Sequence, residues 1–146
     1  MTKSQFPSSR FTLETGFHVT VQVPESHTDR VMAAIMKTAS LEQGDYDSVA
    51  FRTAQGVQQF RSLGTGHNPE SPGVVEIPCL ELGFFMPNDP RRVTEMLEAI
   101  YHAHPYEEPV IRVQDASRTR HIPGLDEGNP NRIWNSPDAE WYKPKS

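Results

Sequence analysis

The chain has 146 residues, a formal net charge of −5 and an apolar fraction of 36%. This length suits one domain, and thirteen prolines indicate that part of the chain is extended and poorly cored. Nucleic-acid binding is not expected, because it normally requires a basic surface. No apolar stretch has the length of a membrane helix or of a signal-peptide core. We therefore expect a cytoplasmic protein without membrane or nucleic-acid partners.

The first third of the chain predicts one strand and one helix. Residues 1–16 are polar and rich in Ser and Thr, so we expect a flexible N-terminal arm. Valines then alternate with polar residues over 19–23, which is typical of a half-buried strand. Over 31–39 the apolar residues recur every three or four positions, as on one face of a helix. The candidate N-caps of this helix are Ser26, Thr28 and Asp29.

The middle of the chain predicts strands over 48–53 and 57–63, joined by a short hairpin at 54–56. Residues 64–73 form a loop rich in Gly and Pro. The alternation over 74–86 predicts a long central strand. Its single cysteine, Cys79, is expected to be a buried apolar side chain.

A second helix is predicted from Asp89, as cap, and Pro90, at the first helical position, to about His104. A last strand is expected over 110–113. The order of elements predicts an α+β, ferredoxin-like fold over 17–114, with an antiparallel sheet and both helices on one face. Because two helices cover only one face of a sheet, the other face needs a partner, which predicts a homo-oligomer.

Residues 115–146 have no apolar period, four prolines and few aliphatic residues. They cannot form a core of their own, and one alternative is a disordered tail. The other is that aromatic residues fix this extension on the domain or on a neighbouring subunit. Those residues are Trp134, Trp141 and Tyr142.

The run at 102–109, HAHPYEEP, concentrates polar chemistry between two prolines. Pro105 must end the second helix and start an extended segment. The candidate ligand-binding residues of the run are His102, His104, Tyr106, Glu107 and Glu108. The same residues equally suit a structural joint in which His104 or Tyr106 forms hydrogen bonds.

A metal site is a further alternative, with His104 and Glu107 as ligands of a divalent metal and Glu108 as base of a metal-dependent hydrolase. The spacing of His102 and His104 differs from the i, i+4 pair of helical zinc sites. Four arginines are the cations available to an anionic ligand: Arg52, Arg61, Arg91 and Arg92. Nucleophilic catalysis is disfavoured, since Cys79 is expected to be buried, and Ser62 with His67 shows no triad pattern.

Four segments resemble the inserted domain of the longer bacterial proteins of the Nif-three-like family (NGG-one-interacting factor three). They are VPESHTDRVMAAI at 23–35, GDYDSVAF at 44–51, FRSLGTGHNP at 60–69 and HAHPYEEP at 102–109. The resemblance implies a PII/CutA-like domain that forms trimers and binds a ligand. It adds Tyr46 and Asp47 to the expected ligand site and suggests a sensing or interaction role without turnover.

The chain departs from that family in two respects. The glycine-rich turn after the first helix is replaced by ASLEQG at 39–44. The domains that carry the paired metal site of the family, in a His-His-Pro context, have no counterpart here, so their hydrolase-like activity is not implied. A separate dimetal protein is instead a candidate partner.

Overall fold

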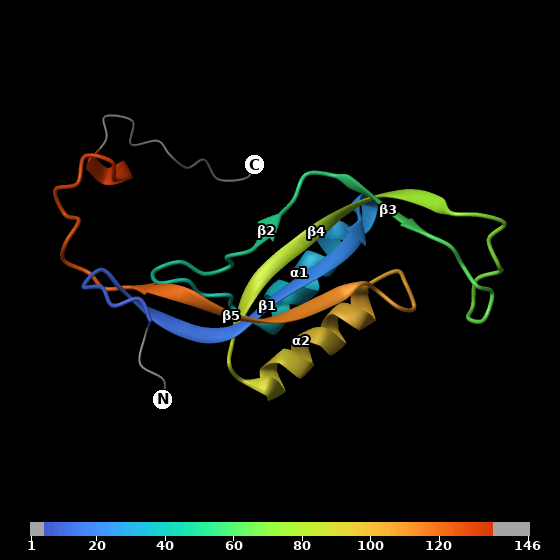
Figure 1. Ribbon diagram of the computed structural model, residues 1–146, viewed down its shortest axis with the longest axis horizontal. Coiled ribbons are helices and arrows are strands. Elements are labelled where there is room, and N and C mark those ends of the chain that lie inside the picture. Colours follow the sequence, from blue (N-terminus) through green and yellow to red (C-terminus); the bar gives the residue numbers. More distant parts are fainter. Residues whose placement is uncertain (1–4, 136–146) are drawn as a thin grey trace. The chain divides into compact units, whose positions relative to one another are not determined.

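The computed structural model describes residues 5–135 of the chain (Figure 1). The five strands form one sheet in the order β2-β4-β1-β5, with β3 also paired to β4. The elements are, in chain order, β1 Phe11–Pro24, the 3-10 turn η1 Glu25–His27, α1 Thr28–Thr38, β2 Phe51–Arg52, β3 Gly56–Phe60, β4 Val75–Pro87, α2 Pro90–Ala103, β5 Ile111–His121 and the 3-10 turn η2 Ile133–Asn135. The prediction of an α+β, ferredoxin-like fold is confirmed.

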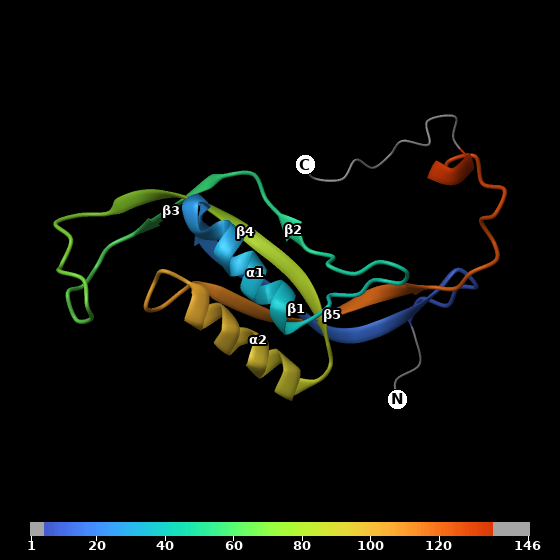
Figure 2. The same cartoon turned by 180° about the vertical axis from the view of Figure 1, so that it is seen from behind.

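The core lies between the sheet and the two helices, which occupy the same face of the sheet (Figure 2). Alternate residues of β1 and β4 enter it, and each helix contributes one apolar stripe, as the periodicity predicts. Its most deeply buried members are Val19, Val21, Val23, Val31, Ile35, Leu82, Met96 and Ile100. The strands are antiparallel, with Val21 opposite Leu82.

The two helices begin differently. In α2, Pro90 occupies the first turn and the Asp89 carboxylate accepts a hydrogen bond from the Arg92 N–H at 3.4 Å, as predicted. In α1 the predicted N-caps are wrong, because the cap position is His27 and no side chain caps it. The η1 turn precedes the helix, and the Thr28 hydroxyl donates to the carbonyl of Pro24 instead.

The hairpin predicted at 54–56 is wrong. Strands β2 and β3 do not pair with each other; both pair with β4, with Arg52 opposite Leu82 and Gly56 opposite Cys79. From Arg52 to Gly56 the edge strand advances by four residues, whereas β4 advances by only three, from Leu82 to Cys79. Residues 53–55 therefore contain a bulge in one interrupted edge strand.

Strands β1 and β5 are longer than the sequence pattern indicates. β1 starts at Phe11, within the segment expected to be a flexible arm, and β5 runs to His121, well beyond residue 113. The chain divides into two compact units, residues 14–118 and residues 1–13 with 119–146. Within the described residues, no helix is long and apolar enough to cross a membrane.

Candidate functional site

A groove of about 910 Å³ lies beside the end of α2, in the unit formed by residues 14–118. One wall consists of β3 and the following loop, residues 58–68, and the other of the turn and strand start at 105–110. The turn forms here because Pro105 cannot continue the helix, so α2 ends at Ala103 with His104 extended. Three of the predicted site residues line the groove: Tyr106, Glu107 and Glu108.

His104 is buried beneath this turn and joins it to the sheet. Its Nε2 lies 2.7 Å from the carbonyl oxygen of Gln22 in β1, and its Nδ1 lies 3.1 Å from the backbone nitrogen of Tyr106. The backbone N–H of Tyr106 can only donate, so Nδ1 accepts and Nε2 carries the proton. Burial lowers the pKa of His104. This geometry matches the structural joint that the sequence left open.

Tyr106 lies between His104 and Phe60. The ring centroids of Tyr106 and His104 are 5.0 Å apart, and those of Tyr106 and Phe60 are 6.4 Å apart. The Tyr106 hydroxyl oxygen is buried and has no hydrogen-bond partner, and burial raises its pKa. Buried hydroxyl groups are usually satisfied, so Tyr106, a residue of the groove wall, has a buried polar atom that still lacks a partner.

Glu107 closes one end of the groove by accepting two hydrogen bonds from His67. The backbone nitrogen of His67 lies 3.0 Å from Oε1, and its ring Nδ1 lies 2.6 Å from Oε2. Their mutual hydrogen bonding raises the pKa of His67 and lowers that of Glu107. Gly66 permits this approach, because a Cβ atom there would lie 2.5 Å from Oε1.

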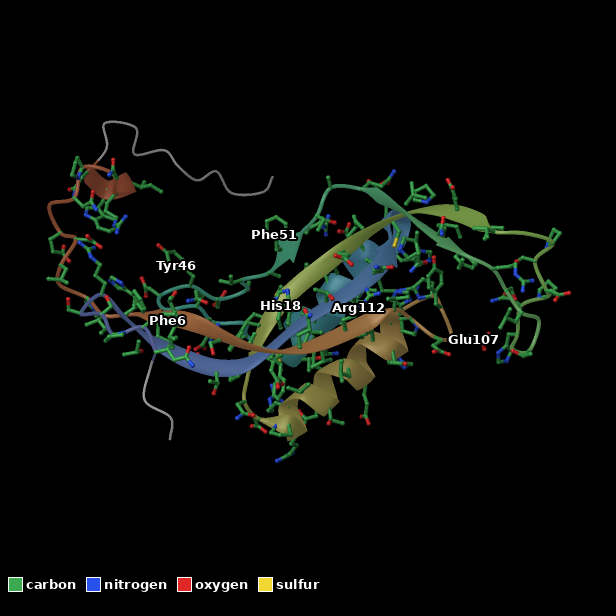
Figure 3. The ribbon with its side chains drawn as sticks, in the orientation of Figure 1. Phe6, His18, Tyr46, Phe51, Glu107 and Arg112 are labelled. Atoms are coloured by element: carbon green, nitrogen blue, oxygen red, sulfur yellow. The ribbon has the colours of Figure 1, made fainter. Side chains whose placement is uncertain are left out.

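The remaining predicted site residues lie apart from this pair. His102 is exposed in the last turn of α2. Tyr46 and Asp47 are exposed in the loop after α1, and Figure 3 shows Tyr46 at the opposite end of the sheet from Glu107. One copy of the chain therefore does not bring Tyr46 to the groove.

The loop that holds Tyr46 is fixed to β5 by Arg118. The guanidinium donates to the carbonyl oxygen of Glu42 at 2.8 Å, pairs with Glu14 at 2.8 Å and stacks 4.2 Å from the ring centre of Phe85. These contacts use the arginine structurally and leave Tyr46 exposed.

The role of His104 and Glu107 as metal ligands stays a prediction, and metal binding would require His104 to change its hydrogen bonds. Both ring nitrogens of His104 are engaged by backbone groups, so one bond would have to break. Within residues 5–135, no three His, Cys, Asp or Glu side chains gather as ligands for a metal ion.

The four arginines considered for an anion each face a carboxylate. Arg52 pairs with Asp29 and Arg61 with Glu70, while Arg91 and Arg92 both pair with Glu95. Arg92 also donates to the carbonyl of Thr38 at 2.6 Å. These contacts reduce the positive charge that each guanidinium offers to an anionic ligand.

The second sheet face, opposite the helices, carries His18, Phe51 and Arg112 (Figure 3). Phe51 is 69% exposed. Two side-chain amides and a carboxylate form a hydrogen-bonded row across three strands on this face: Gln58 donates to Gln22 at 2.7 Å, and Gln22 donates to Glu81 at 3.0 Å. We call this surface the open face. Since Gln58 also lines the groove, the open face and the groove adjoin.

No family model and no curated protein matches this sequence. Solved structures do resemble it. The Bacillus cereus protein related to NIF3 gives a TM-score of 0.60 at 20% identity, over 77% of this chain and 28% of that one. The divalent ion tolerance protein CutA1 from Ehrlichia chaffeensis gives 0.52 at 12% identity, over 70% and 81%. CutA from Xylella fastidiosa gives 0.51 at 12% identity, over 78% and 89%.

The fold is CutA-like. The chain spans little more than a quarter of the NIF3-related chain but most of each of these CutA chains. At these identities the likeness extends to the CutA-like fold and not to a ligand or reaction.

Sequence reasoning missed the part that His67 plays in this CutA-like domain. His67 and Glu107 are 40 residues apart, and no local pattern connects them. The only signal was glycine: Gly64 adopts a positive φ of 77°, and Gly66 leaves room for the carboxylate. Two glycines shortly before a histidine indicated a loop with an unusual backbone conformation or a close contact, but not that the contact would be with Glu107.

Proposed function

We propose that this chain is an oligomeric, CutA-like ligand-sensing or interaction module that works without catalytic turnover, with its ligand in the groove. The observation that carries the proposal is the buried Tyr106 hydroxyl, which has no partner. Leaving such a group unpaired costs about 1–3 kcal/mol, and unsatisfied groups in native proteins frequently indicate a water, ion or ligand.

The charges around the groove favour a ligand that donates hydrogen bonds. Glu107 and Glu108 lie on one wall, whereas Arg61 on the other wall faces Glu70. A small polar molecule carrying an amine or amide would complement these carboxylates, and binding that turns the Tyr106 side chain toward the groove would give its hydroxyl a partner. A strongly anionic ligand is less well matched, since the nearby guanidinium is already paired.

The absence of turnover is supported by the state of His104. A general base needs an accessible nitrogen within reach of the substrate, and the two nitrogens of this ring are bonded to the backbone. The ring therefore serves to hold the turn that carries Tyr106 and Glu107. A metal-dependent hydrolase would need these bonds rearranged.

The oligomer is proposed from the open face. Half-buried and exposed side chains such as Phe51 and Phe85 lie on the side of the sheet opposite the helices, and burying this surface would stabilise an assembly. The resemblance of the sequence to PII/CutA-like domains suggests three subunits. A separate dimetal protein remains a candidate partner of the same surface.

Native mass spectrometry of chelator-treated protein tests the assembly, with a trimer expected. A thermal-shift screen tests the ligand class, using ATP, glutamine, spermidine and Zn²⁺ as anionic, zwitterionic, cationic and metal probes. An organic probe that binds should lose about tenfold in affinity in Tyr106→Phe, which removes one hydrogen bond. His102→Gln, outside the groove, should bind normally. A monomer, or tight stoichiometric Zn²⁺ lost in His104→Ala, would overturn this proposal.

A further inference from the structure

The end of β5 and the segment that follows it adopt a defined structure despite their lack of hydrophobic periodicity. Asp126 is buried and accepts hydrogen bonds from Arg10 and Arg132, which hold the pKa of its carboxyl well below the usual range. Asn135 donates to the carbonyl oxygens of Glu127 and Asn129 at 2.8 and 2.9 Å. We call residues 119–135 the C-terminal arm.

This arm presents large apolar side chains to solvent. Leu125, Ile133 and Trp134 are 54%, 40% and 63% exposed. A tryptophan held on an ordered scaffold and left in water is characteristic of an interface, where Trp is among the residues that contribute most binding energy. The indole N–H has one weak contact, 3.4 Å to the carbonyl of Glu127, and is therefore available to a better acceptor.

The charges of the two units of the chain are complementary. Residues 1–13 with 119–146 contain six Lys and Arg against four Asp and Glu, a formal charge of +2. Residues 14–118 contain eight against fifteen, a charge of −7. Residues 119–135 themselves hold two arginines and two acidic residues, and the surplus positive charge of this unit comes from Lys3 and Arg10. Opposite charges of this kind accelerate and orient association, so the unit that contains the arm in one copy is attracted to the body of another.

The groove supplies a receptor that fits an indole. Phe60 is 39% exposed and Leu63 is 63% exposed on one wall, and the acidic Glu108 lies on the other. The groove also adjoins the open face through Gln58, where the proposed oligomer already brings a second copy.

We infer that the C-terminal arm of one copy seats Trp134 in the groove of a second copy, beside Phe60 and Leu63. This inference rests on the proposed function, because it requires an oligomer. It also extends that proposal: two copies of the chain would build the ligand pocket together, and the indole of one copy would narrow the groove of the other. A groove of about 910 Å³ is at the upper end of the range for small-ligand sites, so a side chain from the partner leaves room for a small ligand.

Photo-cross-linking locates the arm directly. Full-length Trp134→p-benzoylphenylalanine is prepared in ¹⁴N and ¹⁵N forms, mixed, allowed to exchange subunits and irradiated. Cross-links should join residue 134 of one isotopic form to residues 58–68 or 105–110 of the other. The matched control is Tyr101→p-benzoylphenylalanine, at an α2 position that is 51% exposed, and it should not label the groove. Cross-links found only within one isotopic copy would overturn the inference.

Self-association provides the second measurement. Trp134→Ala and Leu63→Glu should each weaken assembly at least tenfold in sedimentation equilibrium, whereas Tyr101→Ala should stay within twofold of the parent. In the Trp141→Phe background, the fluorescence of Trp134 should shift to the red on dilution. If the parent assembles and Trp134→Ala assembles equally well, the arm inference fails and the oligomer stands. If the parent protein is monomeric at every concentration, both the arm inference and the proposed oligomer are wrong.

Discussion

His104 should make the stability of this protein fall at mildly acidic pH. Burial lowers the pKa of the folded ring below the usual 6.5, so the unfolded chain binds the proton more readily. Unfolding then takes up a proton, and the free energy of unfolding decreases as pH falls from about 6.5 toward the lowered folded value. The slope of this contribution reaches about 1.4 kcal/mol per pH unit at most.

The structure also sets the cost of removing the ring. His104→Ala leaves the Gln22 carbonyl and the Tyr106 N–H without their partners at 2.7 and 3.1 Å and opens a cavity, so we expect a loss of about 2–4 kcal/mol. His104→Gln keeps a donor for Gln22 but does not titrate. Its cost should be about 1 kcal/mol at neutral pH, and its stability should lack the acidic slope.

The assay is urea unfolding of the parent and of His104→Gln at intervals from pH 8 to pH 4.5. The difference between the two proteins isolates this ring, because His67 contributes equally to both. The pKa of His67 is raised, so its contribution is present below 6.5 and is lost as pH rises through the raised value. His102→Gln is the matched control, since that side chain is exposed. A parent-minus-variant difference that stays constant below pH 6.5 would refute the role given to His104.

Three further predictions follow from the groove, the sheet and the arm. Glu107→Gln should lower the His67 imidazole pKa toward 6.5 and accelerate amide exchange at His67, both followed by NMR, whereas Glu108→Gln should do neither; an unchanged His67 titration in Glu107→Gln would contradict the pairing. Gly16→Ala should destabilise the fold by about 2 kcal/mol or more, because its Cβ would meet the backbone oxygen of Met86. Gly73→Ala is the control: no atom beyond its chain neighbours lies within 4 Å of the added Cβ, so this variant should be nearly neutral when both are compared by thermal unfolding. Asp126→Asn should expose residues 119–135 to limited proteolysis while the body stays resistant, since it removes the charge that Arg10 and Arg132 hold; equal resistance to the parent would show that the carboxylate is dispensable.

The central elements of the fold could be predicted from the sequence because their buried residues recur with the period of a strand or a helix. The valines of β1 and the alternation in β4 face the core, and Asp89 and Pro90 mark the start of α2. The start of β1 and the whole of β5 lack such a period. No residue of β5 is buried, and neither is any of residues 11–15 in β1, so those residues pair through the backbone without a hydrophobic signature.

The candidate site was partly readable. The prolines located the end of α2, and the chemistry of the run drew attention to Tyr106 and Glu107. Sequence could not choose between ligand and joint for His104, because that depends on the carbonyl of Gln22, 82 residues away. The bulge at 53–55 was mistaken for a turn because Ala-Gln-Gly suits both, and only the pairing of both flanking segments with β4 decides it. The aromatic residues predicted to fix the extension include Trp141 and Tyr142, which lie outside the described residues.

The interrupted edge of the sheet has a consequence for solubility. A long, flat edge strand is a template for uncontrolled pairing with other chains, as in amyloid. Here one edge is broken by the bulge into β2, of two residues, and β3, of five, and the opposite edge strand, β5, carries the charges of Arg112 and Asp115. Neither edge invites strand addition, so concentrated protein should resist fibril formation and add no further strands to its sheet.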